Sequence, residues 1–277
     1  MRAPTHQRHV LVGIDDIQAD AEVLAWAARA ARRRGDMLTI AHAGDTYERC
    51  RAVLDEAAAR AHAAAPGVTV RPYPAEENPA EMLLDQARSA ELTVLGPGRR
   101  RLFSMGAVAE RVVDHAPGPV VIVRGTDHAA VRSVAVGVDP WPDGREASLL
   151  AVEFAIEEAR LNGARLDAVA SYWSPEPPAP ILGQVVGAEF AARRVAAGRA
   201  IEEIVAPYAE KHPEIPVTVE LSAQPPGPVL EQFARRADLV VVGCRDHGPV
   251  GRFMLGSVGH GLAHHAACPV AIVRSGR

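Results

Sequence analysis

The sequence predicts an α/β protein of two tandem domains, each with a five-stranded, mainly parallel sheet that is covered by helices on both faces. Short apolar runs alternate with longer helix-forming segments along the whole chain of 277 residues, which is the pattern of such sheets. The pattern also occurs twice. Residues 9–15 read HVLVGID where residues 133–139 read SVAVGVD, and residues 114–124 read DHAPGPVVIVR where residues 264–274 read HHAACPVAIVR. Because both the beginning and the end recur, the repeating unit is a whole domain.

In the first half, five apolar runs are typical of strands, and four segments rich in Ala, Leu, Arg and Glu favour helix. The expected strands are residues 10–14, 37–42, 68–71, 92–95 and 120–123. The expected helices are residues 19–34, 46–65, 79–89 and 108–115. Helical crossovers between successive strands imply a mainly parallel sheet, because parallel neighbours need such connections and are buried on both faces.

The second half repeats this order, with strands expected at residues 134–138, 165–171, 217–221, 239–242 and 270–273. It is longer: Asp139 follows Asp15 by 124 positions, whereas Pro269 follows Pro119 by 150. Most of the additional length lies between its second and third strands, where the proline-rich segment 174–180 cannot be helix or central strand. This segment is either a lid over a site or a solvated insertion. We expect the domains to be residues 1–127 and 130–277, joined through the polar segment 125–132.

Composition indicates a soluble globular protein. Hydrophobic residues make up 48% and charged residues 23% of the chain, and the formal net charge is −4, which argues against a nucleic-acid partner. The first eight residues are polar, and no apolar run approaches the roughly 20 residues that a bilayer requires, so we expect a cytoplasmic protein with no membrane contact. The cysteines, Cys50, Cys244 and Cys268, are too few and too widely spaced for a disulfide framework or a zinc knuckle.

Candidate binding residues follow the strands of the second half. Open α/β sheets bind ligands at the carboxyl ends of their strands, where the strand order reverses. Asp139 ends the first strand, and the strand 239–242 runs into a glycine-rich loop, GCRDHGPVGRFMLGS, at residues 243–257. Its glycines allow the backbone to approach an anion closely, and the start of the next helix, at Ser257, offers free amide groups.

These residues resemble the universal stress protein family in its tandem two-domain form, and the resemblance covers nearly the whole chain. It implies Rossmann-like domains that bind ATP, with or without Mg²⁺. Nucleotide-binding members carry a glycine, two residues, a second glycine, nine residues, and then glycine followed by Ser or Thr; here Asp246 stands at the second glycine. The resemblance implies that Asp139 contacts the adenine side of ATP and that the loop holds ribose and phosphates. The expected binding residues are Val138, Asp139, Gly243, Arg245, Gly248, Gly256, Ser257 and Val258.

Two features argue against a fully developed site. The Asp246 carboxylate would repel a triphosphate by about 1 kcal/mol per charge pair at 4 Å in water. In the first half the loop from Gly96 to Gly106 is three residues shorter than its counterpart, and Ala107 replaces the serine. We expect a weakened or empty first site that retains Asp15 as its strand-end acid. The simpler alternative is that Asp15 and Asp139 cap the following helices and that the glycines only form turns and packing contacts.

Other chemistry is not indicated. The sequence contains no GxSxG, HExxH or Walker motif, so we expect no dedicated enzyme and at most slow ATP hydrolysis. His260, His264, His265 and Cys268 suggest a metal site only weakly, and Cys244 is better explained by packing than as a redox sensor. We therefore expect an ATP-binding regulatory module of the stress response. The alternatives are a nucleotide-free interaction scaffold and a nucleotidyl-transfer enzyme, and the latter lacks an HxGH or pyrophosphate-loop motif.

The last strands of the halves, residues 120–123 and 270–273, are expected to pair as sheet edges, as in the resembling family. Such pairing within one chain would give an intrachain pseudo-dimer, and we expect two chains to associate further as a homodimer.

Overall fold

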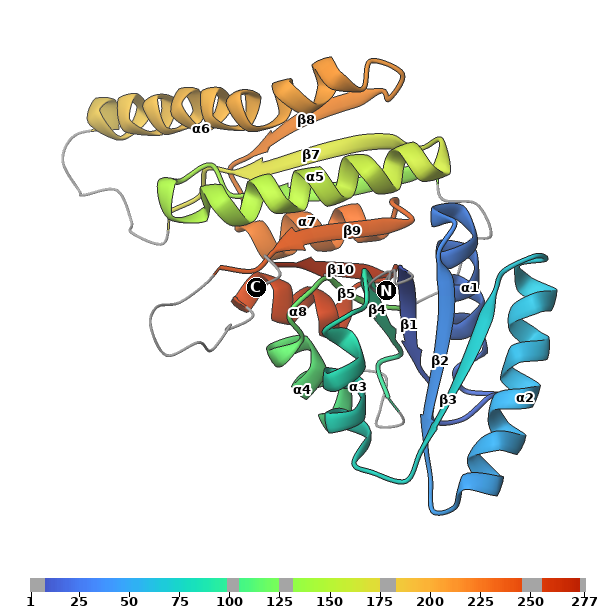
Figure 1. Ribbon diagram of the computed structural model, residues 1–277. Coiled ribbons are helices and arrows are strands. Elements are labelled where there is room, and N and C mark those ends of the chain that lie inside the picture. The colour runs from blue at the N-terminus through green and yellow to red at the C-terminus, as the bar shows by residue number, and fades with distance from the viewer. Residues whose placement is uncertain (1–7, 99–104, 125–131, 175–182, 246–255, 275–277) are drawn as a thin grey trace, which may run out of the picture.

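The computed structural model describes residues 8–98, 105–124, 132–174, 183–245 and 256–274, with the side chains of residues 183–187 left aside. These residues form one ten-stranded sheet with helices on both faces (Figure 1). The first half contains β1 (His9–Gly13), α1 (Ala21–Arg34), β2 (Met37–Ala43), α2 (Tyr47–Ala64), β3 (Val70–Ala75), α3 (Pro79–Ala87), β4 (Leu92–Leu95), α4 (Ala107–His115) and β5 (Val120–Ile122). The second contains β6 (Ser133–Val138), the 3₁₀ turn η1 (Pro142–Gly144), α5 (Arg145–Asn162), β7 (Arg165–Ser171), α6 (Gly183–Lys211), β8 (Val217–Ser222), α7 (Pro226–Ala234), β9 (Leu239–Gly243), α8 (Ser257–His265) and β10 (Val270–Val273).

The strand order is β3-β2-β1-β4-β5-β10-β9-β6-β7-β8. Neighbours within each half are parallel, and β5 and β10 pair antiparallel between the halves. The predicted fold class is confirmed, and the expected pairing of the last strands joins both sheets within one chain. Val121 lies opposite Ala271, its counterpart in the repeat, so an approximate twofold axis passes between these two residues.

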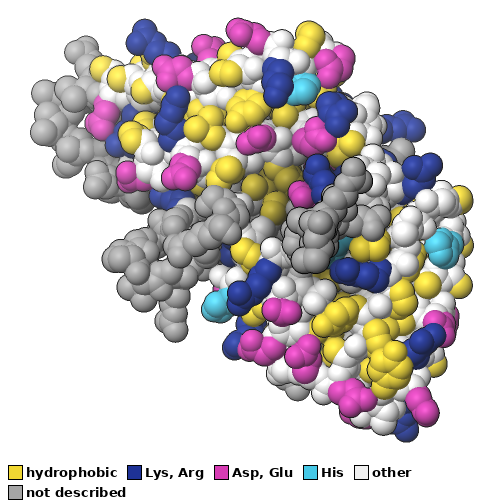
Figure 2. Space-filling model, viewed as in Figure 1, with side chains coloured by type: hydrophobic (Ala, Val, Ile, Leu, Met, Phe, Trp, Pro, Cys, Tyr) yellow, Lys and Arg dark blue, Asp and Glu magenta, His cyan; other side chains and the backbone are white. Residues whose placement is uncertain are grey.

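Two hydrophobic layers cover the sheet. Val10 and Val12 of β1 belong to the layer formed with α1, α2, α5 and α6. Leu11, between them, belongs to the opposite layer, formed with α3, α4, α7 and α8. Successive side chains of a strand point to opposite faces, which explains why the central strands are continuous apolar runs. No described helix is both long and apolar enough to cross a bilayer. On the surface shown in Figure 2, acidic and basic side chains are interspersed.

Element positions agree with the sequence predictions within about two residues, with two exceptions. β3 continues through Pro72 and Pro74 to Ala75, whereas the sequence placed its end at Arg71; proline is tolerated there because β3 is an edge strand. The additional length of the second half is partly helical, since α6 has 29 residues where α2 has 18. The proline-rich segment that the sequence singled out lies, after Ser174, outside the described residues.

Reciprocal polar contacts join the halves. The Arg124 guanidinium donates to the His264 carbonyl at the end of α8, and Arg274, its counterpart, donates to the carbonyls of Val113 and Ala116 (3.3 Å) at the end of α4. An arginine at a helix C-terminus satisfies free carbonyls and complements the helix dipole. The recurring final arginine of each repeat therefore caps a helix of the other half.

A buried ion pair joins the same two halves on the opposite face. Arg34, at the end of α1, pairs with Glu158 of α5, and their side chains are only 10% and 3% exposed. The Arg34 guanidinium also lies 5.7 Å from the centre of the Phe154 ring. Glu158 follows Arg34 by 124 positions, which is the offset between the repeats before these helices, so corresponding positions of the repeat carry opposite charges.

Candidate functional site

Each half contains one point at which the strand order reverses. β1 lies between β2 and β4, and β6 lies between β7 and β9. The chain goes from β1 to β2 on one side and later returns to β4 on the other side of β1. It does the same from β6 to β7 and then to β9. A crevice at the carboxyl ends of such strands is the usual ligand site of this architecture. Asp15 and Gly96 follow β1 and β4 in the first half. In the second half Asp139 follows β6, and Gly243 is the last residue of β9.

In the second half, the Asp139 carboxylate is turned toward β9. Its Oδ1 accepts the Trp141 N–H at 3.0 Å, and its Oδ2 accepts the Arg245 guanidinium. The backbone N–H of Asp139 donates to Oγ of the buried Ser148 at 2.8 Å. Arg245 follows β9, so this ion pair spans the crevice between β6 and β9. Asp139 thus stabilises the turn after β6 through Trp141, and its second oxygen faces the candidate site. It does not cap the following helix, as the simpler alternative expected, because neither η1 nor α5 has a side-chain cap.

Two glycines make this arrangement possible. A Cβ at Gly144 would lie 2.2 Å from Cγ of Asp139, and a Cβ at Gly243 would lie 2.1 Å from the carbonyl oxygen of Ala147 in the first turn of α5. Gly144 therefore leaves room for the Asp139 side chain. Gly243 is required by the packing of β9 against α5, whatever the loop binds.

The start of α8 supplies amide donors. The helix begins at Ser257, preceded by Gly256 without a side-chain cap, and its first hydrogen bond runs from the His260 N–H to the Gly256 carbonyl at 2.9 Å. The amides of the first turn, including that of the half-buried Val258, therefore have no acceptor within the helix. A Cβ at Gly256 would meet no described atom within 4 Å, and its φ is −57°. Among the described residues, neither packing nor backbone conformation requires glycine at this position.

Of the other predicted residues, Val138 is buried at the end of β6. Gly248 and Asp246 lie outside the described residues.

The first-half crevice is built differently. The Asp20 carboxylate accepts the backbone N–H groups of Asp15 (2.7 Å) and Asp16 (3.1 Å), and its other oxygen lies 3.0 Å from the position of a Cβ on Gly96. A fixed carboxylate thus stands between the ends of β1 and β4. Asp20 corresponds to Gly144 in the repeat, since both precede the first helix of their half by one residue.

Among the described residues of the first-half loop, no arginine stands at the position of Arg245. Gly98 takes the place of Arg245, two residues after Gly96, and its φ is +83°, a value that favours glycine. A Cβ there would lie 3.2 Å from the backbone of Gly106. Gly106 precedes α4 without a side-chain cap, as Gly256 precedes α8. Helix-start amide groups are thus present in both halves, and in the second half an acid and an arginine, Asp139 and Arg245, also meet at the crevice.

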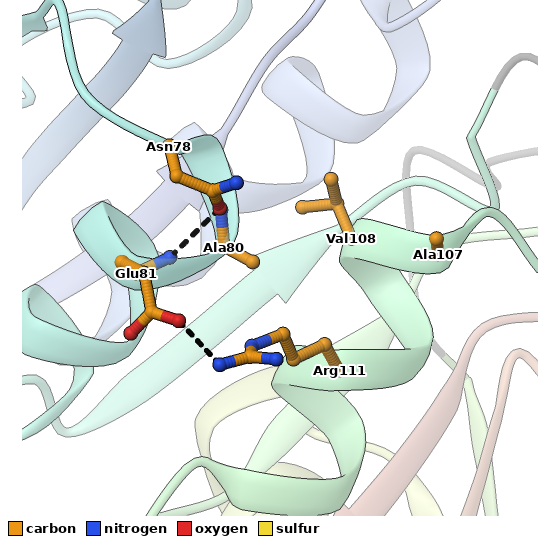
Figure 3. A pocket seen from close by; sticks show the side chains of 6 residues that line it. All are labelled: Asn78, Ala80, Glu81, Ala107, Val108 and Arg111. Carbon is orange, nitrogen blue, oxygen red and sulfur yellow. Dashed lines mark hydrogen bonds and ion pairs between the residues drawn. The ribbon is translucent and has the colours of Figure 1, made fainter.

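A pocket of about 260 Å³ opens beside Gly106, between the first turns of α3 and α4 (Figure 3). It is lined by Asn78, Ala80, Glu81, Ala107, Val108 and Arg111. The two charged side chains among these residues, Glu81 and Arg111, pair with each other. Because small-molecule pockets usually occupy about 300–1,000 Å³, and because its charges are mutually neutralised, this pocket is a poor match for a nucleotide.

One histidine of α8, His264, is buried and bound to the backbone. His264 Nδ1 accepts the Met105 N–H at 3.2 Å, and the rings of His260 and His264 are 4.2 Å apart. Burial, followed by the neighbouring His260, lowers the pKa of His264. Among the described residues, no three His, Cys, Asp or Glu side chains are placed to hold a metal ion.

The cysteines are buried. Burial raises the pKa of the Cys268 thiol to about 12. Cys244 is 5% exposed, and its N–H donates to the Val273 carbonyl at 2.8 Å. Both thiols therefore behave as small core side chains.

Of the residues that sequence reasoning singled out, the structure brings Asp139 and Arg245 together beside Gly243, whereas Asp20 and Gly144 were not singled out. Aligning the repeats at an offset of 124 would have placed these two residues opposite each other. The presence of an acid, Asp20, in one half and a glycine, Gly144, at the same position of the other was the signal that could have pointed to them.

The comparisons with known proteins agree with this architecture. The sequence model of the universal stress protein family matches residues 45–124 and 130–274. The chain is 30% identical over 295 aligned positions to the universal stress protein Rv2623 of Mycobacterium tuberculosis, with 96% of each chain covered. Its fold is similar to crystal structures of a putative universal stress protein from Pseudomonas aeruginosa (TM-score 0.72, 17% identity, 96% of this chain and 93% of that one) and of one from Archaeoglobus fulgidus (TM-score 0.69, 18% identity, 99% and 100%). The chain therefore belongs to the universal stress protein family.

Proposed function

We propose that the second half binds one ATP, with Mg²⁺, at the crevice between β6 and β9, and that the protein acts as a regulatory module of the stress response. The ligand would change the shape or partner choice of the protein, with at most slow hydrolysis. The observation that carries this proposal is the Asp139–Arg245 pair, an acceptor and a cation at the point where the strand order reverses. The uncapped start of α8, the helix that follows β9 in the chain, offers further donors.

Binding would exchange the partners of this ion pair. The Asp139 carboxylate would accept hydrogen bonds from the base or ribose, and the Arg245 guanidinium would turn to the phosphates, where charge-assisted hydrogen bonds are strong. The amides of Ser257 and Val258 would add donors with the positive end of the α8 dipole behind them. Because the pair is partly exposed, with side chains 43% and 25% exposed, breaking it costs on the order of 1 kcal/mol or less.

Calorimetric titration with ATP and Mg²⁺ tests the location of the site. Gly256→Val should abolish binding without unfolding the chain, because the position of its Cβ is open. Gly106→Val is the matched control at the start of α4, and it should leave ATP binding unchanged. Unaltered affinity in Gly256→Val, with circular dichroism unchanged, would refute the proposed site.

Arg245→Ala separates the two roles of the ion pair. Loss of a charge-assisted contact to phosphate should weaken ATP binding by roughly 10–100-fold, equivalent to about 1.5–3 kcal/mol. Adenosine, which has no phosphate, should bind to Arg245→Ala as well as to the wild type or slightly better, because no ion pair has to be broken to free the Asp139 carboxylate. Equal weakening of both ligands would show that Arg245 does not distinguish phosphate.

We propose that the first half binds no nucleotide, despite Asp15, Gly96 and Gly106, because the Asp20 carboxylate would face the phosphates. We also propose domains at residues 1–127 and 130–277, a cytoplasmic location and a homodimer.

A nucleotide-free interaction scaffold is the second candidate. It is favoured by the same ion pair, since Asp139 and Arg245 already satisfy each other without a ligand. Acid extraction of the freshly purified protein, followed by chromatography of the extract, distinguishes the two: stoichiometric adenine nucleotide excludes the scaffold. An extract without nucleotide, together with no heat of ATP binding in calorimetry, would support the scaffold.

A further inference from the structure

The ten-stranded sheet ends in two outer strands, β3 in the first half and β8 in the second (Figure 1). An outer strand presents unpaired N–H and C=O groups that can pair with another chain, and proteins usually protect such edges. These two strands occupy corresponding positions of the repeat, so their sequences can be compared for features that prevent pairing with another chain.

The β3 edge is blocked. The Leu38 N–H donates to the Thr69 carbonyl at 2.8 Å, and the Gly44 N–H donates to the Ala75 carbonyl at 3.0 Å. In a parallel ladder alternate residues bond to the neighbouring strand, so the odd-numbered residues of β3 face β2. The even-numbered residues face outward, and they are Val70, Pro72 and Pro74. Two of these three outward positions have no N–H to donate.

The β8 edge has no such protection. The Leu166 N–H donates to the Pro216 carbonyl and the Tyr172 N–H donates to the Ser222 carbonyl, both at 2.9 Å. The even-numbered residues of β8 therefore face β7, and the backbone groups of Val217, Val219 and Leu221 face outward. Each of these residues carries an N–H, so β8 offers a regular row of donors and acceptors.

The side chains of β8 also suit a partner strand. Val217 and Leu221 pack against the core, whereas Val219, on the same face between them, is 45% exposed. On the other face, Thr218 donates to Asp167 at 2.7 Å, and Glu220 pairs with Arg236 at 3.1 Å. The strand thus carries one exposed apolar side chain at its centre and a neutralised acid beside it.

We propose that β8 pairs antiparallel with β8 of a second copy of this chain, centred on Val219, so that the sheet continues through a homodimer. In this register Val219 faces Val219 and Val217 faces Leu221, and each such pair exchanges two backbone hydrogen bonds. Thr218 lies opposite Glu220, so the two acids are not opposed. Centring on Glu220 instead would place like charges directly opposite each other, which is destabilising.

The occupant is a second copy because the strand is complementary to itself. The centred register uses all three outward residues, covers the exposed valine with its own symmetry mate and leaves each Glu220 with its arginine. A C2 interface requires such self-complementarity. This inference concerns assembly alone, and it does not depend on nucleotide binding.

Sedimentation equilibrium of the full chain tests the proposed β8 interface by measuring the oligomeric state. Val219→Pro removes the central outward N–H and copies the protection found in β3, and we expect it to raise the dimer dissociation constant at least about tenfold, the equivalent of one net hydrogen bond. Val70→Pro is the matched control on the opposite edge, and it should leave the dimer intact. A wild-type monomer throughout the micromolar range overturns the proposal, as does a dimer that Val70→Pro dissociates and Val219→Pro does not.

Cross-linking tests the register without relying on proline. Val219→Cys should form a disulfide-linked dimer under mild oxidation, because Cα atoms of a hydrogen-bonded pair are about 5.5 Å apart, within disulfide range. The natural cysteines are buried and should not compete. Glu220→Cys is the control, since its symmetry mate would lie diagonally at about 7–8 Å. Cross-linking of Glu220→Cys as fast as Val219→Cys would overturn the register.

Discussion

The ion pair between Arg34 and Glu158 should stabilise the joined halves strongly, and Glu158→Gln tests this. The side chains are 10% and 3% exposed, so the substitution leaves a guanidinium buried without its counter-charge. Removing one partner of a buried pair typically costs about 3–5 kcal/mol. Because a glutamine oxygen still accepts a hydrogen bond, we expect the lower end of this range, about 3 kcal/mol.

Urea unfolding followed by circular dichroism measures this loss. For a chain of this size the denaturant slope is at least about 3 kcal/mol per molar, so the midpoint should fall by roughly 1 M. The control is Glu157→Gln, one position away in α5. Glu157 pairs with Arg160 at 2.7 Å, but the two side chains are 43% and 45% exposed, and an exposed pair is worth about 0.2–1 kcal/mol.

A double substitution completes the test. Arg34→Met with Glu158→Met removes both charges and keeps similar volume, and such replacements are often neutral. The double variant should therefore be more stable than Arg34→Met alone or Glu158→Met alone, with a coupling energy between the two substitutions of about 2 kcal/mol or more. Single effects below about 1 kcal/mol that simply add in the double variant would refute the argument, because they would mean that the pair is solvated.

Three further variants or measurements test local features. Gly243→Ala should destabilise the protein by about 1–3 kcal/mol in urea unfolding, because its Cβ would lie 2.1 Å from the Ala147 carbonyl; Gly256→Ala, whose Cβ is unobstructed, should cost less than about 1 kcal/mol, and equal effects would contradict the packing. The pKa of His264 is lowered by burial, so the folded state favours the neutral ring and stability should fall as pH drops below the unfolded value of about 6.5. His264→Asn should flatten this dependence in urea midpoints taken at about pH 7.5 and about pH 5.5, and an unchanged slope would assign it to other groups. Cys268, with its pKa raised to about 12, should resist a thiol reagent at about pH 8 until the protein unfolds; rapid labelling of the folded protein at this residue would contradict its burial.

Much of the fold could be predicted because its signals are local. β4 and β10 were each predicted as an uninterrupted apolar or β-branched run, and the internal repeat predicted that the second half would carry the same order of elements as the first. β3 was predicted too short because Pro72 and Pro74 are unfavourable for a central strand, and only the strand order shows that β3 is an edge. No helix bounds were predicted for the second half; α6 continues through Gly198 and Pro207, residues of low helix propensity, because tertiary packing overrides propensity here.

The candidate site was predicted less completely because its decisive contacts are not local. The sequence indicated Asp139 and Arg245 separately, but their ion pair spans 106 positions and depends on β6 and β9 being neighbours. The position of the Asp20 carboxylate between Asp15 and Gly96 depends likewise on the adjacency of β1 and β4. Neither pairing follows from periodicity, which specifies the elements but not the neighbours they acquire.

The central claim is that one residue, Asp20 or Gly144, decides which crevice is open, and the stoichiometry of ATP binding in Gly144→Asp tests it most directly. Calorimetry should give one ATP per wild-type chain. Binding should be lost in Gly144→Asp, with circular dichroism unchanged, because the added side chain would occupy the space of the Asp139 carboxylate. Two ATP molecules per wild-type chain, or undiminished affinity in Gly144→Asp, would contradict the account.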